Sequence, residues 1–121
     1  MEDSTKAPKT GLTTLDPNAG HVTTINTYTV TPERAEEVLI YLVHSAEETV
    51  RNVPGFLSFN FHLSLDHTQI VNYGQWESRE AVMDARESPK VKALMAETVK
   101  VAGRSNSVPY VLRKSVPAAG K

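Results

Sequence analysis

Asn72 and Trp76 stand four residues apart in residues 69–76, a segment whose β-branched and aromatic residues are typical of a β-strand. Because successive side chains of a strand alternate between its faces, Asn72, Gly74 and Trp76 point to the same side. The carboxamide and the indole N–H are both hydrogen-bond donors, and the glycine between them is expected to leave open space. Two donors beside an open space predict a small-molecule site on this strand.

The strand and helix that precede this segment are indicated by the period of the apolar residues. Residues 21–30 are rich in Thr, Val, Ile and Tyr and predict a strand. Thr31 and Pro32 then provide an N-cap and a first-turn proline, so a helix is expected to begin there. Apolar residues at helical spacing continue as far as Pro54-Gly55, where the pattern ends.

Residues 56–65 alternate between apolar and polar side chains, which predicts a strand with one buried face. The apolar positions, which we expect to lie under the helices, are Leu57, Phe59, Phe61, Leu63 and Leu65. Asp66-His67-Thr68 is typical of a turn, so this strand and residues 69–76 are expected to form a hairpin. The polar positions, among them His62, then face the other side of the sheet.

The second half of the chain predicts a broken helix and a last strand. Ser78 is expected to cap the helix, and Ser88-Pro89 to break and restart it. Gly103 fits the helix end. Residues 108–116 predict a strand that Pro109 places at the edge of a sheet.

The resulting order, β-α-β-β-α-β, predicts an α+β fold of the ferredoxin-like type, with an antiparallel sheet and both helices on one face. The domain is expected over residues 21–116, between a flexible N-terminal arm (1–20) and a disordered tail (117–121). The other face of the sheet lacks helices, and a small chain must cover it or expose it. We expect a second copy to pack there, forming a homodimer.

The helix side of the sheet is expected to hold the ligand pocket. Asn72 and Trp76 are assigned to this side because Trp76 lies beside the second helix, and Asn26 and Tyr28 of the first strand are expected to share it. The apolar lining is expected from the hairpin and the second helix: Phe59, Phe61, Val82, Leu94 and Met95. Two amides and an indole that converge on an apolar pocket match the usual composition of ligand sites.

Composition excludes several classes of function. The net charge of -1 gives no electrostatic reason to expect binding to nucleic acid or to an anionic membrane. The chain has no cysteine, which excludes thiol catalysis and disulfides, and its histidines have no metal-binding spacing. A long apolar run for a membrane span or signal peptide is missing, so a cytoplasmic protein is expected.

VPGFLS, SLDHTQIVNY and QWESREA, in this order and spacing, resemble the antibiotic-biosynthesis monooxygenase family, and most closely its members from aromatic polyketide pathways of the actinorhodin type. With the flanking elements the resemblance extends over residues 21–115. It implies a homodimeric ferredoxin-like barrel that oxygenates quinol- or anthrone-type phenols with no metal, flavin or haem. The pocket asparagine and tryptophan of the family fall on Asn72 and Trp76, and the first-strand asparagine of several members falls on Asn26.

The chain also departs from the family pattern on the second helix. The tyrosine and arginine that some polyketide members use there appear here as Val82 and Met95. Haem-degrading relatives carry a tryptophan and a ligating histidine on this helix, and this chain has Ala85 and Met95 instead. Haem degradation is therefore not expected.

Three functions remain open on the sequence. The first is a cofactor-independent monooxygenase that converts a polycyclic phenol or anthrone to a quinone with O2. In it, donors from Asn72, Asn26 and Trp76 stabilise the substrate oxyanion. The second is a dimer that binds an aromatic small molecule without turnover. The third is a non-oxidative cyclase or dehydratase on the same fold.

Overall fold

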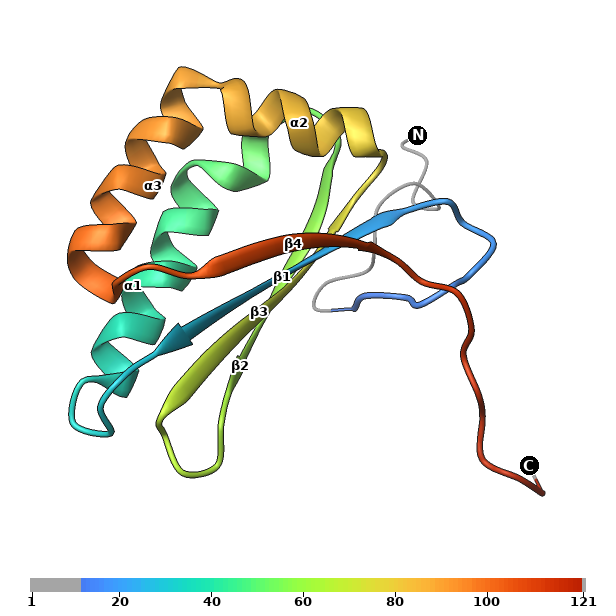
Figure 1. Cartoon of the computed structure of the whole chain (residues 1–121), viewed down its shortest axis with the longest axis horizontal. Helices are drawn as coiled ribbons and strands as arrows, with labels where there is room; N and C mark the ends of the chain where they lie inside the picture. The colour runs from blue at the N-terminus through green and yellow to red at the C-terminus, as the bar shows by residue number, and fades with distance from the viewer. Residues whose placement is uncertain (1–11, 121) are drawn as a thin grey trace, which may run out of the picture.

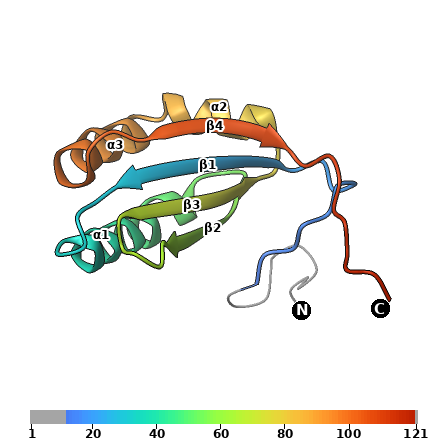
Figure 2. The same cartoon turned by 60° about the horizontal axis from the view of Figure 1, so that its bottom comes forward.

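The computed structural model describes residues 12–120 and has the predicted order of elements. The elements are β1 (Val22–Thr29), α1 (Ala35–Glu48), a 3-10 helix η1 (Val50–Asn52), β2 (Phe56–Leu63), β3 (Gln69–Trp76), α2 (Arg79–Glu87), α3 (Pro89–Ala102) and β4 (Asn106–Val111). The strands form one antiparallel sheet in the order β2-β3-β1-β4 (Figure 1). All three α-helices lie on one face of it (Figure 2). The ferredoxin-like prediction is confirmed.

Strand register aligns the side chains of the helix face in rows across the sheet. One row takes a residue from each strand: Phe61, Asn72, Asn26 and Ser107. The adjacent row contains Phe59, Gly74, Thr24 and Pro109. Neighbouring strands lie about 4.8 Å apart, so the first row places three polar side chains side by side. Asn72 and Asn26 are therefore direct cross-strand neighbours, as their shared side predicted.

A β-bulge corrects the prediction for β2. Phe56 pairs with Trp76 and Ser58 pairs with Gln75, so Leu57 is the extra residue between them. Phe56, and not Leu57, therefore faces the helices, where its ring packs edge-on to Trp76 with centroids 5.4 Å apart. The prediction was also wrong for Leu65, which lies beyond the end of β2 and is fully exposed.

The helix-start prediction for α1 was wrong by one turn. Residues 32–34 form a turn in which the Arg34 N–H donates to the Thr31 carbonyl (3.0 Å), and α1 begins at Ala35. Ser78 does cap α2, since its Oγ accepts a hydrogen bond from the Ala81 N–H at 3.1 Å. Gly103 ends α3 with a φ of 78°, as predicted.

The predicted break at Ser88-Pro89 separates α2 from α3, and Pro89 is the first residue of α3. Pro109 lies in β4, an edge strand, as predicted, although β4 spans Asn106–Val111 and not residues 108–116.

The hairpin turn is held by Asp66. Its Oδ1 accepts hydrogen bonds from the Thr68 hydroxyl (2.7 Å), the Thr68 N–H (3.1 Å) and the Ser64 hydroxyl (2.8 Å). These bonds, led by the one from the Thr68 hydroxyl, lower the pKa of the Asp66 carboxyl below its ordinary value. His67 takes the positive φ, 63°, that the reversal requires. The turn at residues 66–68 is therefore as predicted.

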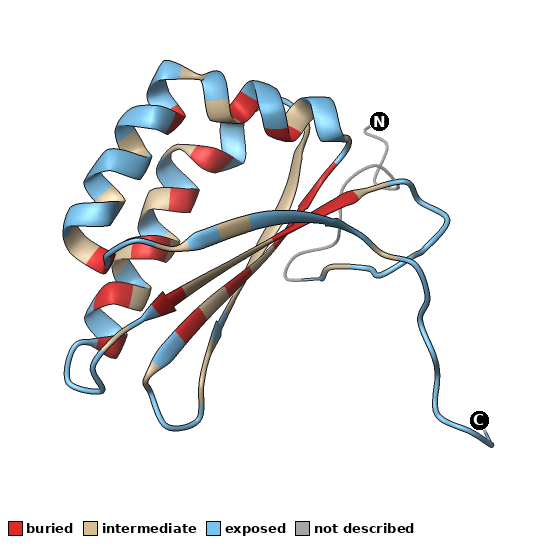
Figure 3. Ribbon diagram, viewed as in Figure 1, coloured by how far each residue is buried: buried red, intermediate tan, exposed pale blue. Residues whose placement is uncertain are grey.

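The buried side chains form two groups under the helices (Figure 3). One group surrounds Trp76 and Val82, and the other surrounds Tyr28 and Ile70. Phe61 packs against both groups, so it lies where they meet. The sheet and helices are thus joined at two places, with space between them for the cavity described below.

The segment before β1 contacts the other face of the sheet. The Thr13 hydroxyl donates to Asn60 Oδ1 (2.8 Å), and Gln75 Nε2 donates to the Thr14 carbonyl (2.9 Å). The flexible arm expected over residues 1–20 stays a prediction, and residues 1–11 lie outside the described part. The disordered tail over 117–121 stays one as well. Within residues 12–120, no helix combines the length and apolarity that crossing a membrane requires.

Candidate active site

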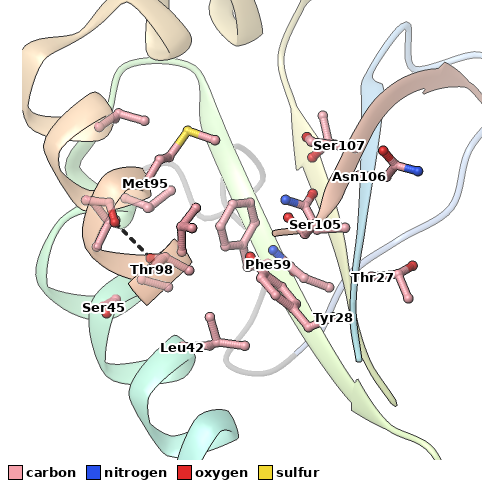
Figure 4. A pocket seen from close by; sticks show the side chains of 18 of the residues that line it. Thr27, Tyr28, Leu42, Ser45, Phe59, Met95, Thr98, Ser105, Asn106 and Ser107 are labelled. Carbon is pink, nitrogen blue, oxygen red and sulfur yellow. Dashed lines mark hydrogen bonds between the residues drawn. The ribbon is translucent and has the colours of Figure 1, made fainter. Parts of the chain in front are cut away.

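A cavity of about 830 Å³ lies between the helix face of the sheet and helices α1, α2 and α3. Every residue that the sequence analysis assigned to the pocket lines it: Asn26, Tyr28, Phe59, Phe61, Asn72, Trp76, Val82, Leu94 and Met95. Figure 4 shows Phe59 and Tyr28 on the sheet side, opposite Met95 and Thr98 of α3. The structure brings these side chains together, and their roles stay predictions.

Asn72 is held in one orientation by β2. Its side chain is 3 % exposed, and its Oδ1 accepts a hydrogen bond from the backbone N–H of Asn60 at 3.2 Å. Because a backbone N–H can only donate, the amide oxygen must face β2, which leaves the Nδ2 group as the free end. No hydrogen-bond partner of Nδ2 lies in residues 12–120, and Asn72 lines the cavity. The amide therefore offers two N–H donors to a ligand.

Trp76 is bound differently from the prediction. Its Nε1–H was expected to point at the ligand, but it donates to the Thr24 hydroxyl at 3.2 Å in a buried environment. Thr24 also lines the cavity, and its hydroxyl accepts from the indole while keeping one proton to donate. A donor can therefore reach a ligand from Thr24, with Trp76 as its support.

Gly74 does not leave the open space that was predicted. A Cβ at this position would lie 2.8 Å from Cδ1 and Cε1 of Phe59 and 2.8 Å from Oγ1 of Thr24. The missing side chain is thus occupied by the phenyl ring and the hydroxyl of the neighbouring strands. Glycine allows Phe59 and Thr24 to lie close against β3, and the cavity begins above them.

Aromatic rings form the sheet-side wall of the cavity near Trp76. Phe59 packs edge-on to Phe61 and Trp76, with ring centroids 6.0 and 6.2 Å apart. Edge-to-face contacts fix the orientation of these rings, since ring edges are positive and ring faces negative. A rigid aromatic wall opposite apolar side chains of α2 and α3 suits a flat, fused-ring ligand.

The α2–α3 break shapes the opposite wall. Val82 lies on α2 and is buried, whereas Leu94 and Met95 lie on α3, which runs in a new direction after Pro89. Met95 is 46 % exposed although it lines the cavity. It therefore marks the mouth, where a flexible thioether side chain can adapt to a ligand.

The charged residues that line the cavity are both arginines, Arg86 of α2 and Arg104 after α3. Arg86 Nη2 donates to the carbonyl and hydroxyl oxygens of Ser107, at 3.2 and 3.3 Å. Within residues 12–120, no Asp, Glu or His lines the cavity, and no cluster of three or more His, Cys, Asp or Glu could hold a metal ion. The described site therefore has positive charge but no side-chain base of these types.

Sequence reasoning missed Thr24, Arg86 and Ser107. Arg86 could have been found because it follows Val82 by four residues and so shares its helix face. Thr24 and Ser107 depend on strand register, which no pattern in the sequence specifies.

The chain matches the family model of antibiotic biosynthesis monooxygenases over residues 21–97. It is 36% identical over 81 residues to tetracenomycin-F1 monooxygenase of Streptomyces glaucescens, which covers 67% of this chain and 72% of that protein. The chain belongs to the antibiotic biosynthesis monooxygenase family. The resemblance inferred from the hairpin, and the prediction of a monooxygenase, are confirmed.

Solved structures of similar proteins agree with this membership. The monooxygenase from the gene ActVA-Orf6 of Streptomyces coelicolor, in complex with nanaomycin D, has a TM-score of 0.71 and 28% identity. The match covers 86% of this chain and 96% of that one. SnoaB of Streptomyces nogalater, a cofactor-independent oxygenase, has the same fold, with a TM-score of 0.64, 20% identity, and coverage of 83% and 100%.

Gly74→Ala is expected to destabilise this monooxygenase by about 1–3 kcal/mol, because the added methyl group overlaps Phe59 and Thr24. Urea denaturation measures the loss. The control is the same substitution combined with Phe59→Ala, in which the cost should shrink because one obstacle is gone. Equal stability of Gly74→Ala and the parent protein would show that space does exist there.

Thr24→Val is expected to cost about 1–3 kcal/mol, because it leaves the buried Trp76 N–H without an acceptor. The chain has one tryptophan, so the intrinsic tryptophan emission reports on this site alone. We expect the emission spectrum to shift in Thr24→Val and to be restored in Thr24→Ser, which keeps the hydroxyl. An unchanged spectrum and stability in the valine variant would contradict the Trp76–Thr24 hydrogen bond.

Proposed function

We propose that this family member oxidises a polycyclic phenol or anthrone to a quinone with O2, without a metal, flavin or haem. The observation that carries the proposal is the amide of Asn72, which β2 orients so that its N–H donors face an aromatic-walled cavity. Its relatives support the reaction class, since one is named for tetracenomycin F1 and another is described with a bound nanaomycin. Action in the cytoplasm stays a prediction.

The reaction needs only the substrate and O2. Loss of a proton from an anthrone methylene gives a carbanion with its charge delocalised onto oxygen, and this anion passes one electron to O2. Recombination of the substrate radical with superoxide forms the C–O bond, and a proton gives the hydroperoxide. Loss of water from the hydroperoxide leaves the carbonyl of the quinone, so one oxygen atom enters the product and the other leaves in water.

The contribution of the protein is to stabilise the anion. A well-placed donor in a site shielded from water is worth about 3 kcal/mol, and Asn72 supplies such a donor. Asn26 is its cross-strand neighbour on the same face and lines the same cavity. Since no carboxylate or imidazole was found in the described lining, the proton leaves to water, aided by donors that lower the acidity barrier of the substrate.

The two other functions differ from this one in measurable ways. A cyclase or dehydratase would need a general acid and base, for which the described lining offers no carboxylate or imidazole. A binding protein without turnover would keep the cavity but consume no O2. Oxygen uptake with dithranol, a simple anthrone, in protein treated with a chelator separates oxygenation from both.

Asn72→Asp is expected to lower the rate of O2 uptake about 100-fold or more. The aspartate keeps an acceptor for the Asn60 N–H but replaces the donors that face the cavity with an acceptor. The matched control is Asn60→Ala, which removes an amide whose Nδ2 bonds the Tyr73 carbonyl and does not line the cavity. The control should keep the rate within about threefold. An active Asn72→Asp enzyme would overturn the proposed role of Asn72.

The homodimer is proposed for the face of the sheet that lacks helices. Val108 and Tyr110 of β4 pair with Ile25 and Thr23 of β1 and lie on that face, 43% and 48% exposed. Apolar side chains at this level of exposure on a sheet face favour a partner surface, and a second copy gives sheet-to-sheet packing.

Tyr110→Asp is therefore expected to shift the protein toward monomer, because a carboxylate would be buried in the interface. Light scattering coupled to gel filtration measures the mass. Ile40→Asp is the control, since Ile40 is 65% exposed on α1, away from this face. A parent protein that is monomeric at micromolar concentration would contradict the dimer.

A further inference from the structure

Arg86 is a cation that the reaction outlined above does not use. It lies in the last turn of α2, lines the cavity and is half-buried. Its Nη2 group donates to both oxygens of Ser107, so β4 fixes the position of the guanidinium. None of the ion pairs formed within residues 12–120 includes it.

The guanidinium retains donors for a ligand. Arg has five N–H groups, and the two on Nη2 are directed at Ser107, which leaves three. These three have no hydrogen-bond partner in residues 12–120, yet no side-chain nitrogen or oxygen that is fully buried in this part of the chain lacks a partner. The free N–H groups of Arg86 therefore lie in accessible space beside the cavity.

Strand register sets the distance between this cation and Asn72. Ser107 pairs with Asn26, and Asn26 pairs with Asn72, so two strand spacings separate Ser107 from Asn72. At about 4.8 Å per spacing this is about 10 Å. Figure 4 shows Ser107 on β4, on the side of the cavity opposite Met95. A rigid ligand of several fused rings can span this distance and touch both groups.

We propose that Arg86 binds an anionic oxygen of the substrate, and that the substrate of this enzyme is a fused-ring phenol that carries a carboxylate. This inference rests on the proposed function and adds the substrate class. A carboxylate is favoured because it is fully ionised at neutral pH, and a cation without an acidic partner in a largely apolar cavity gains most from a permanent anion. With the carboxylate at Arg86, the ring that reacts lies at the other end of the row, beside Asn72.

Isothermal titration calorimetry with anthraquinone-2-carboxylate and its methyl ester tests this inference without turnover. The two ligands share the ring system and differ in charge. We expect the parent protein to bind the carboxylate at least about 10-fold more tightly than the ester. In Arg86→Gln the affinity for the carboxylate should fall about 10- to 100-fold, and the affinity for the ester should change less than about threefold.

Arg79→Gln is the matched control. It makes the same change of charge on the same helix, at an exposed residue that does not line the cavity. Its preference for the carboxylate should equal that of the parent. Retained affinity for the ester in Arg86→Gln also shows that the cavity is still folded.

Several results would overturn the inference: equal affinity of the parent for the two ligands, no binding of the carboxylate at millimolar concentration, or a preference that survives in Arg86→Gln. Loss of the preference in Arg104→Gln alone would assign it to the other arginine and would also overturn it. Oxygen uptake with dithranol, which carries no carboxylate, tests the proposed oxygenation independently. A carboxylate preference in a protein that consumes no O2 would refute oxygenation and leave the role of Arg86 standing.

Discussion

The register of the three strand pairings is the constraint on which the site depends. It aligns Asn72, Asn26 and Ser107 in one row on the helix face and places Thr24 beside Gly74 in the next. A shift of one residue in any pairing would turn one strand's contribution to the opposite face. The bulge at Leu57 keeps Phe59 and Phe61 on the helix face while Phe56 still packs on Trp76. Register and bulge together decide which groups a ligand can meet.

Asn72 and Trp76, the pair that first suggested a site, have different tasks in this arrangement. The Asn72 oxygen is used by β2, and this contact is what turns its N–H donors toward the cavity. Trp76 donates its only polar hydrogen to Thr24 and places its ring among Phe56 and Phe59. Trp76 thus contributes shape and supports Thr24, and the donor that it was expected to provide passes to the hydroxyl.

The fold and the side of each strand could be predicted because both follow from local patterns. Alternation assigned Asn72 and Trp76 to the helix face, and Ser88-Pro89 marked the break between α2 and α3. The errors occur where tertiary contacts decide. The bulge at Leu57 breaks the period of two, and the neighbours of Gly74 come from strands far away in the sequence. A single sequence holds no local signal for either.

Arg86 was missed for a related reason: a lone arginine in a polar helix is usually a solvated residue, and only the contact with Ser107 shows otherwise. The helix-start error at Thr31 has a different origin, since a tighter turn at residues 32–34 satisfies the same preferences one turn before α1. Local capping signals therefore located the helix but not its first residue.

The charge of the cavity bears on how a substrate can lose its proton without a side-chain base. A cation about 10 Å away stabilises an anion by about 1.7 kcal/mol at an effective dielectric constant of 20, or about one pKa unit. A donor at Asn72 worth about 3 kcal/mol adds about two units. A phenol with a pKa near 10, the value for tyrosine, would then ionise near pH 7. If a substrate carboxylate neutralises Arg86, however, the first contribution largely disappears. Arg86 would then orient the substrate, and Asn72 would supply most of the acidity.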